Sequence, residues 1–293
     1  MHSTNPVLSR PDAFTSQQQQ AQPGYPQQGY PQQGYPQQGG FQQPQYGYQQ
    51  PGQQFPGQPY APQQPVQAAR GVMTIDDVIT KTAITLGALI ITAALTFMFL
   101  PIELLYPSLI ISGLVGFVTV LFVSFRRLVN PALVLLYAAI EGIFIGAFSL
   151  LFETMFPGIV VQAVLGTFAA AGVTLAAYKA FRIKVTNRFR KVVLISTMAF
   201  AGVMLINLVM AMFGVDLGLR TVGGGFNMLA LVASAIGVVL AVFNLIMDFD
   251  YIEQGIAMQA PASESWRGAF GLTVTMVWLY TELLRIMSYF RSN

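Results

Sequence analysis

The stretch "FNMLALVASAIGVVLAVFNLIM", residues 226–247, contains no charged side chain and is followed directly by "DFDYIEQG", residues 248–255. A helix of about 20 apolar residues is long enough to cross the hydrocarbon core of a bilayer. The two stretches together predict a membrane-spanning helix that ends at a group of acids.

The whole chain is far more apolar than a soluble protein. Of its 293 residues, 54% are hydrophobic and 9% are charged, whereas soluble proteins average about 25% charged residues. The composition therefore predicts a membrane protein in contact with the lipid bilayer. Because the chain has no cysteine and its one histidine is His2, disulfides, thiolate metal sites and a catalytic or metal-binding histidine inside the membrane are excluded.

Seven apolar segments of this kind follow one another along residues 73–293. Thr74 is expected to cap the first helix, with Asp76 and Asp77 in its first turn. The predicted fold is an all-α polytopic bundle of seven transmembrane helices. The seven segments are residues 82–100, 108–125, 131–152, 159–178, 192–213, 226–247 and 269–290.

Residues 1–72 have a different composition, rich in glutamine, proline, glycine and tyrosine. The repeat GYPQQ begins at Gly24, Gly29 and Gly34. Such a segment buries too little apolar area to offset the entropy cost of ordering it, about 1–2 kcal/mol per residue. It is predicted to be a disordered cytoplasmic tail. A solubilising spacer is the simpler interpretation, and a tract that self-associates or docks a partner is the alternative.

Lysine and arginine in the short connections predict the orientation. Arg126 and Arg127 lie between the second and third segments, and six basic residues lie between the fourth and fifth, whereas the connection after the fifth has only Arg220. Since basic loops stay in the cytoplasm, the N-terminus is expected inside and the C-terminus outside a cytoplasmic membrane. The basic connection is interpreted as a topology signal with a solvated face, and no nucleic-acid partner is expected.

Acids within the apolar segments are the candidate functional residues, because an ionised group in the bilayer costs several kcal/mol unless it is paired or wet. They are Glu141 in the third segment, Asp248 and Asp250 at the end of the sixth, and Glu282 in the seventh. Arg285 lies three residues after Glu282, so a local ion pair is expected there. Asp248 and Asp250 lie about 200° apart on a helix, so only one of them is expected to point into the bundle.

Three motifs carry a resemblance to a known family. They are "EGIFIGAF" at residues 141–148, "MDFDYIEQG" at residues 247–255 and "LYTELLRI" at residues 279–286. Together they resemble the Bax inhibitor-1 family of transmembrane proteins, in particular its bacterial branch. The resemblance covers roughly residues 73–288 and leaves the glutamine-rich tail outside.

The resemblance implies a seven-helix fold with the seventh helix at its centre, and a calcium leak gated by two acids that share a proton. The matching positions are Asp250 and Glu282, where the second departs from the aspartate usual in the family. The family arginine that bridges the acids is matched to Arg126, with Arg127 close behind. From the residues themselves, Arg285, Asp248 and Glu141 are expected as further supporting charges. Calcium is the expected permeant ion, the two paired acids are its expected ligands, and no cofactor is implied.

This pair predicts a pH switch with a definite sign. Two carboxylates held close in a low-dielectric site cannot both ionise cheaply, so the pair binds a proton near neutrality. When both acids are ionised they repel each other and open the cytoplasmic end, or they bind a divalent cation. When one is protonated, they share a hydrogen bond and hold the sixth and seventh helices together. Asp250 and Glu282 are therefore expected to be in side-chain contact.

Glu141 is expected to face the bundle interior beside the small residues of "EGIFIG". A place on the ion path and a protonated acid bonded to neighbouring backbone are both open for it.

Other classes of protein fit less well. The seventh segment has no lysine for a retinal Schiff base, and the residues for a metal-dependent or aspartyl intramembrane protease are missing. An enzyme is therefore not expected. The alternative to a channel is an interaction protein that modulates membrane proteases or stress responses through membrane-protein partners, with the acids purely structural.

Overall fold

The computed structural model describes residues 71–126, 129–220 and 227–292, which all belong to one compact unit. The predicted tail lies outside the described residues, apart from its last two positions. Seven α-helices form the unit, each long and apolar enough to cross a membrane, and no strand occurs in the described ranges. The helices are α1 (Ile75–Phe99), α2 (Leu105–Ser124), α3 (Pro131–Met155), α4 (Ile159–Ala180), α5 (Asn187–Met212), α6 (Met228–Ala257) and α7 (Glu264–Arg291), with a short 3-10 helix η1 (Ile102–Leu104) before α2.

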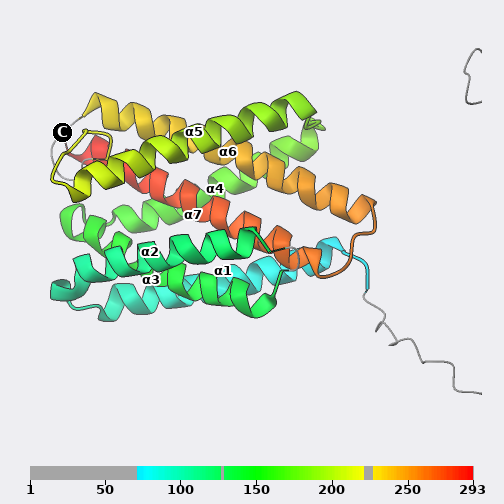
Figure 1. Cartoon of the computed structure of the whole chain (residues 1–293), viewed down its shortest axis with the longest axis horizontal. Helices are drawn as coiled ribbons and strands as arrows, with labels where there is room; N and C mark the ends of the chain where they lie inside the picture. The colour runs from blue at the N-terminus through cyan, green and yellow to red at the C-terminus, as the bar shows by residue number, and fades with distance from the viewer. Residues whose placement is uncertain (1–70, 127–128, 221–226, 293) are drawn as a thin grey trace, which may run out of the picture. The chain divides into compact units, whose positions relative to one another are not determined.

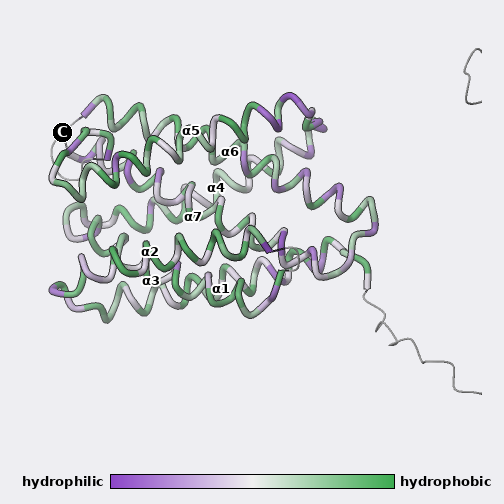
Figure 2. The backbone as a smooth tube through the Cα atoms, viewed as in Figure 1, coloured by the Kyte–Doolittle hydropathy of each residue, from purple (hydrophilic) through white to green (hydrophobic). Residues whose placement is uncertain are grey.

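These helices confirm the predicted all-α, seven-helix membrane fold. The first begins as expected, because the Thr74 side chain accepts a hydrogen bond of 3.1 Å from the backbone N–H of Asp77. Apolar side chains exposed along the helices provide the surface that contacts lipid (Figure 2).

The sixth and seventh helices are longer than their apolar segments. Helix α6 continues to Ala257 and α7 already begins at Glu264. The expectation that Asp248 and Asp250 close the sixth helix is therefore wrong, since both lie inside it. Hydropathy marks only the apolar part of a helix, whereas the backbone stays helical through the polar turns that follow.

Helix α7 lies between two groups of helices, as Figure 1 shows. Helices α1 and α2 pack on α3, helices α4 and α5 pack on α6, and α7 contacts α1, α3, α4 and α6. Buried residues occur along the whole length of α7, from Ser265 to Tyr289. The expected central position of the seventh helix is confirmed.

The small residues of "EGIFIG" bring α3 against α1. A Cβ added at Gly142 would overlap the Thr92 side chain and the Leu89 carbonyl, and one added at Gly146 would overlap the Ala93 carbonyl. Small residues four apart allow two membrane helices to approach this closely. These glycines therefore serve helix packing.

Helix α5 is the least enclosed of the seven. Its buried residues are Val193 and Asn207 alone, and its backbone packs closely only against α6. Figure 2 shows hydrophilic residues gathered where α4 passes into α5. Because so little apolar surface holds α5, its polar contacts with α6 are important for keeping it in place.

Candidate functional site

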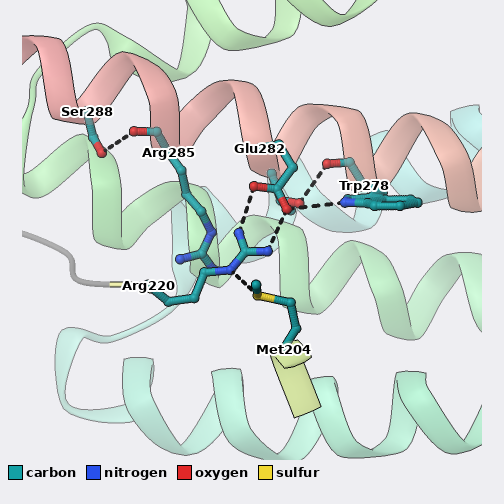
Figure 3. Close-up of polar contacts among 7 residues, drawn as sticks. Met204, Arg220, Trp278, Glu282, Arg285 and Ser288 are labelled. Carbon is teal, nitrogen blue, oxygen red and sulfur yellow. Dashed lines mark hydrogen bonds and ion pairs between the residues drawn. The ribbon is translucent and has the colours of Figure 1, made fainter. Parts of the chain in front are cut away.

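Glu282 is held by an arginine that comes from the connection between α5 and α6. Its side chain is 2% exposed. Both carboxylate oxygens accept hydrogen bonds of 2.7 Å from the Arg220 guanidinium, and Trp278 Nε1 donates to Oε1 at 3.2 Å (Figure 3). A bidentate arginine–carboxylate pair of this kind is both strong and directional.

A glycine of α6 makes room for this carboxylate. A Cβ added at Gly237 would lie 2.7 Å from Cδ and 2.8 Å from Oε1 of Glu282. Such distances are too short for real contacts, so only glycine fits there without a shift. Glu282 therefore lies at the level of Gly237 along α6.

Arg285 does not pair with Glu282, contrary to the sequence-based expectation. Arg220 occupies both oxygens of Glu282, and the Arg285 guanidinium lies over the Phe148 ring, 5.0 Å from its centroid. Figure 3 shows the two guanidinium groups beside each other. The Arg285 Nε is buried without a hydrogen-bond partner among the described residues.

Asp250 is held by a different arginine at another level of the bundle. Arg190, in the first turn of α5, donates to Asp250 Oδ2 at 2.8 Å, and Gln254 Nε2 donates to the same oxygen at 2.7 Å. The Asp250 side chain is 11% exposed and that of Arg190 is 47% exposed. Next to it, Tyr178 of α4 donates to Glu253 at 2.6 Å. This ion pair therefore lies closer to solvent than the one at Glu282.

The expected contact between Asp250 and Glu282 is wrong. Glu282 lies beside Gly237, and Asp250 follows Gly237 by thirteen residues on the same helix, which corresponds to about 20 Å of helix rise. The two acids therefore form no shared calcium site. Moreover, the described residues contain no group of three or more histidines, cysteines or acids arranged to hold a metal ion.

Asp248 faces α7, whereas Asp250 faces α5. Its Oδ2 accepts a hydrogen bond of 2.6 Å from Thr275 Oγ1, and its Oδ1 lies against Gly271. The two aspartates thus point to different helices, which agrees with their predicted angular separation of about 200° on α6. The expectation that only one of them points into the bundle is wrong, because a neighbouring helix contacts each.

The other supporting charges lie apart from this site. Arg126 is exposed and its guanidinium lies over the Phe122 ring at 4.5 Å, so it does not bridge the acids. Glu141 is partly buried between α3 and α2, where a Cβ added at Gly116 would lie 2.9 Å from its Oε2. Glu141 therefore lies against α2, whereas the small residues beside it, Gly142 and Gly146, face α1.

One polar contact between α5 and α6 lies between the levels of the two ion pairs. Asn244 Nδ2 donates to Thr197 Oγ1 at 2.8 Å, between the levels of Asp250 and Glu282. The buried Asn207 lies further along α5 on the same course. The three contacts lie at successive levels along α6, at Asp250, at Asn244 and, through the facing Glu282, at Gly237. We call Arg190–Asp250, Thr197–Asn244 and Arg220–Glu282 the polar seam.

Sequence reasoning missed the two arginines of the seam. Arg190 is one of six basic residues in its connection, and nothing in the pattern separates it from the others. Arg220 gave a weak signal, because it is the one basic residue between the fifth and sixth apolar segments. A lone basic residue next to a membrane-spanning segment is a candidate partner for a buried acid, because charges inside a membrane bundle pair with one another.

Because the two acids are distant, their effects on stability should be independent. The losses in unfolding free energy of Asp250→Asn and Glu282→Gln should add in the double variant to within about 0.5 kcal/mol, as for sites without shared partners. Chemical unfolding in detergent of the wild type, both single variants and the double variant measures this. A coupling energy well above 1 kcal/mol would instead indicate that the two acids interact directly.

The family model described as "Bax inhibitor 1 like" matches residues 5–292. The match also covers nearly all of the glutamine-rich segment, which the three motifs left outside. No curated protein matches the chain.

Proposed function

The chain belongs to the Bax inhibitor 1 like family of membrane proteins, and we propose that it is a pH-sensitive cation leak with calcium as the expected permeant ion. The proposal rests on one observation: α6 and α7 each bury a carboxylate whose arginine partner comes from α5 or from the connection that follows it. It includes no enzymatic reaction.

In this proposal the cation passes along the polar seam, and the path is closed as long as both ion pairs are intact. Each acid is neutralised by an arginine, and carboxylate oxygens are the ligands that calcium prefers. A cation that enters the seam must therefore meet acids whose arginines have moved away. Helix α5 is suited to such a movement, because its packing is limited and its ends are tied by Arg190 and, through the next connection, by Arg220.

Protons act on this gate with the opposite sign to that expected for a shared carboxylate pair. An ionised Asp250 holds Arg190, whereas a protonated Asp250 has no charge with which to hold it. Acidification therefore opens the path, and a rise in pH closes it. The groups that face Asp250 are Arg190 from α5, Gln254 from α6 and the Tyr178–Glu253 contact between α4 and α6.

Of the two acids, we assign the gate to Asp250. Its pair with Arg190 is the more exposed, so protons reach it from solvent, whereas Glu282 is enclosed. With the orientation predicted from the basic connections, this end of the seam faces the cytoplasm of a bacterial cell.

The test is calcium uptake into proteoliposomes that contain the full chain, measured over a series of pH values. Uptake should rise as the pH falls. Arg190→Gln should give the high rate at every pH, because the contact that the proton breaks is already absent. Arg188→Gln is the matched control, since it removes the same charge two positions earlier and should keep the pH response. A wild-type rate that falls on acidification, or equal effects of the two variants, would contradict this gate and favour acids with a purely structural role.

A further inference from the structure

A cavity of about 880 Å³ lies beside the Glu282 ion pair, between α3, α5 and α7. This is within the range of about 300–1,000 Å³ that is typical of sites for organic ligands. Most of its wall is apolar or aromatic, and its charged groups lie together on one side. The apolar wall includes Tyr106, Phe148, Leu151, Phe200, Leu208 and Trp278.

The buried charges that line this cavity do not balance. Glu282 carries one negative charge, whereas Arg220 and Arg285 carry two positive charges. Asp216 also lines the cavity, but it is exposed and its Oδ1 accepts a hydrogen bond from the Gly218 N–H at 2.8 Å. Among the described residues, the enclosed part of the cavity thus has an excess of one positive charge.

The excess charge is located at Arg285. Arg220 is saturated by Glu282, but Arg285 has an aromatic ring beneath its guanidinium and a buried Nε without a hydrogen-bond partner in the described residues. In Figure 3 its guanidinium lies alongside that of Arg220, away from the carboxylate. Two adjacent like charges in a membrane bundle are costly unless an anion compensates them.

We propose that this cavity binds an amphiphilic oxyanion, a molecule with one carboxylate or phosphodiester group and an apolar chain, and that Arg285 binds its charged group. A guanidinium suits both kinds of oxyanion, because its N–H groups match two oxygens at once. The apolar wall suits the chain, and a small inorganic ion would leave most of the cavity unfilled. Leu208 and Met155 are partly exposed at the margin of the cavity, where a molecule dissolved in the bilayer meets the protein.

The proposed binding site does not depend on whether the protein conducts cations, so its test uses no flux measurement. Two sources share the required chemistry: an acidic phospholipid of the surrounding leaflet and a free fatty acid. Trp278 is a built-in reporter, because it lines the cavity and stacks on Phe200 with ring centroids 5.8 Å apart. The chain has two tryptophans, so Trp266→Phe in the full-length protein leaves Trp278 as the only one.

The experiment measures quenching of Trp278 fluorescence by lipids with brominated chains, added to the Trp266→Phe protein in a neutral detergent. Brominated phosphatidylglycerol and a brominated fatty acid represent the two sources, and brominated phosphatidylcholine is the control without net charge. At least one of the two anions should reach half-quenching at a concentration about tenfold lower than phosphatidylcholine, the difference expected for one charge-assisted contact. The anion that does so identifies the source. Equal quenching by all three would overturn the proposal.

A second comparison tests whether Arg285 binds the charged group. Arg285→Gln should abolish the preference for the anion, and Arg285→Lys should retain part of it. Arg291→Gln is the matched control, because Arg291 belongs to the same helix but is bonded to Pro157 O and Gln162 Oε1. A preference that survives in Arg285→Gln, or is lost in Arg291→Gln, would overturn the assignment. If Arg285→Gln does not fold, Arg285→Lys decides, since an unchanged preference in that variant would equally count against a bidentate contact.

Discussion

Replacing Arg220 with glutamine should raise calcium uptake into proteoliposomes by at least about tenfold at acidic pH, where the Arg190–Asp250 contact is proposed to be released already. The reason is the charge of the cavity beside Glu282. With Arg220, Arg285 and Glu282 it is +1, and without Arg220 it is zero. Two unit charges about 8 Å apart interact by about 2 kcal/mol at an effective dielectric constant of about 20, and a divalent ion doubles this barrier.

The fold should tolerate this change better than the burial of Glu282 suggests. Arg285 lies three residues from Glu282 on α7, so we expect it to become the partner of Glu282 when Arg220 is removed. Arg220→Lys is the control: it keeps the charge of the cavity and loses the two-pronged contact, so its uptake should stay close to that of the wild type.

Glu282→Gln should have the opposite effect on uptake. It raises the charge of the cavity from +1 to +2 and leaves two buried guanidinium groups without an acid, which costs about 3–5 kcal/mol of stability. Rates must therefore be expressed per folded protein, for example by the fraction that elutes as a monodisperse species. If Arg220→Gln and Glu282→Gln change uptake in the same direction, the charge of this cavity does not control cation passage.

The sequence predicted the elements of this fold better than their ends. The seven helices, the Thr74 cap and the central seventh helix are all present. The ends of α6 and α7 were misjudged, because polar turns beyond an apolar segment look like loops to a hydropathy pattern. This error placed Asp250 at the end of its helix, whereas α6 continues for seven further residues to Ala257.

Of the candidate site, the sequence predicted the acids but not their arginine partners. A buried acid is conspicuous in an apolar segment, but its partner is chosen by three-dimensional proximity. Arg190 and Arg220 both lie outside the apolar segments, where basic residues are explained equally well by topology. Their long side chains reach inward from the first turn of α5 and from the connection before α6, and a sequence pattern does not show which of several arginines does so.

The residue at position 282 illustrates how the structure accounts for a departure from the family pattern. The resemblance leads one to expect aspartate there, and glutamate extends one methylene further. Gly237 lies directly opposite and lacks the Cβ that would collide with the Glu282 carboxylate. The longer acid and the glycine are therefore complementary, and a change at one position should be compensated at the other.

Gly237→Ala should accordingly destabilise the protein by about 1–3 kcal/mol, the usual cost of overpacking a well-packed interior. The added methyl group meets a carboxylate that Arg220 and Trp278 hold in place, so relief requires that these contacts break. Gly202→Ala in α5 is the control. A Cβ at Gly202 meets no atom within 4 Å, so alanine there should stabilise the helix by about 0.5–1 kcal/mol. Unfolding of both variants in the same detergent measures the difference in sign.

Compensation is the decisive part of this prediction. Glu282→Asp shortens the acid by one methylene and should restore most of the stability lost in Gly237→Ala, because the carboxylate then withdraws from the new methyl group. In the wild-type background the same change should be destabilising, since it lengthens the contact with Arg220. A double-mutant cycle over Gly237→Ala and Glu282→Asp should therefore give a favourable coupling of about 1 kcal/mol or more. A coupling near zero would mean that Glu282 does not lie against Gly237, and the placement of the buried ion pair at this level of α6 would be refuted.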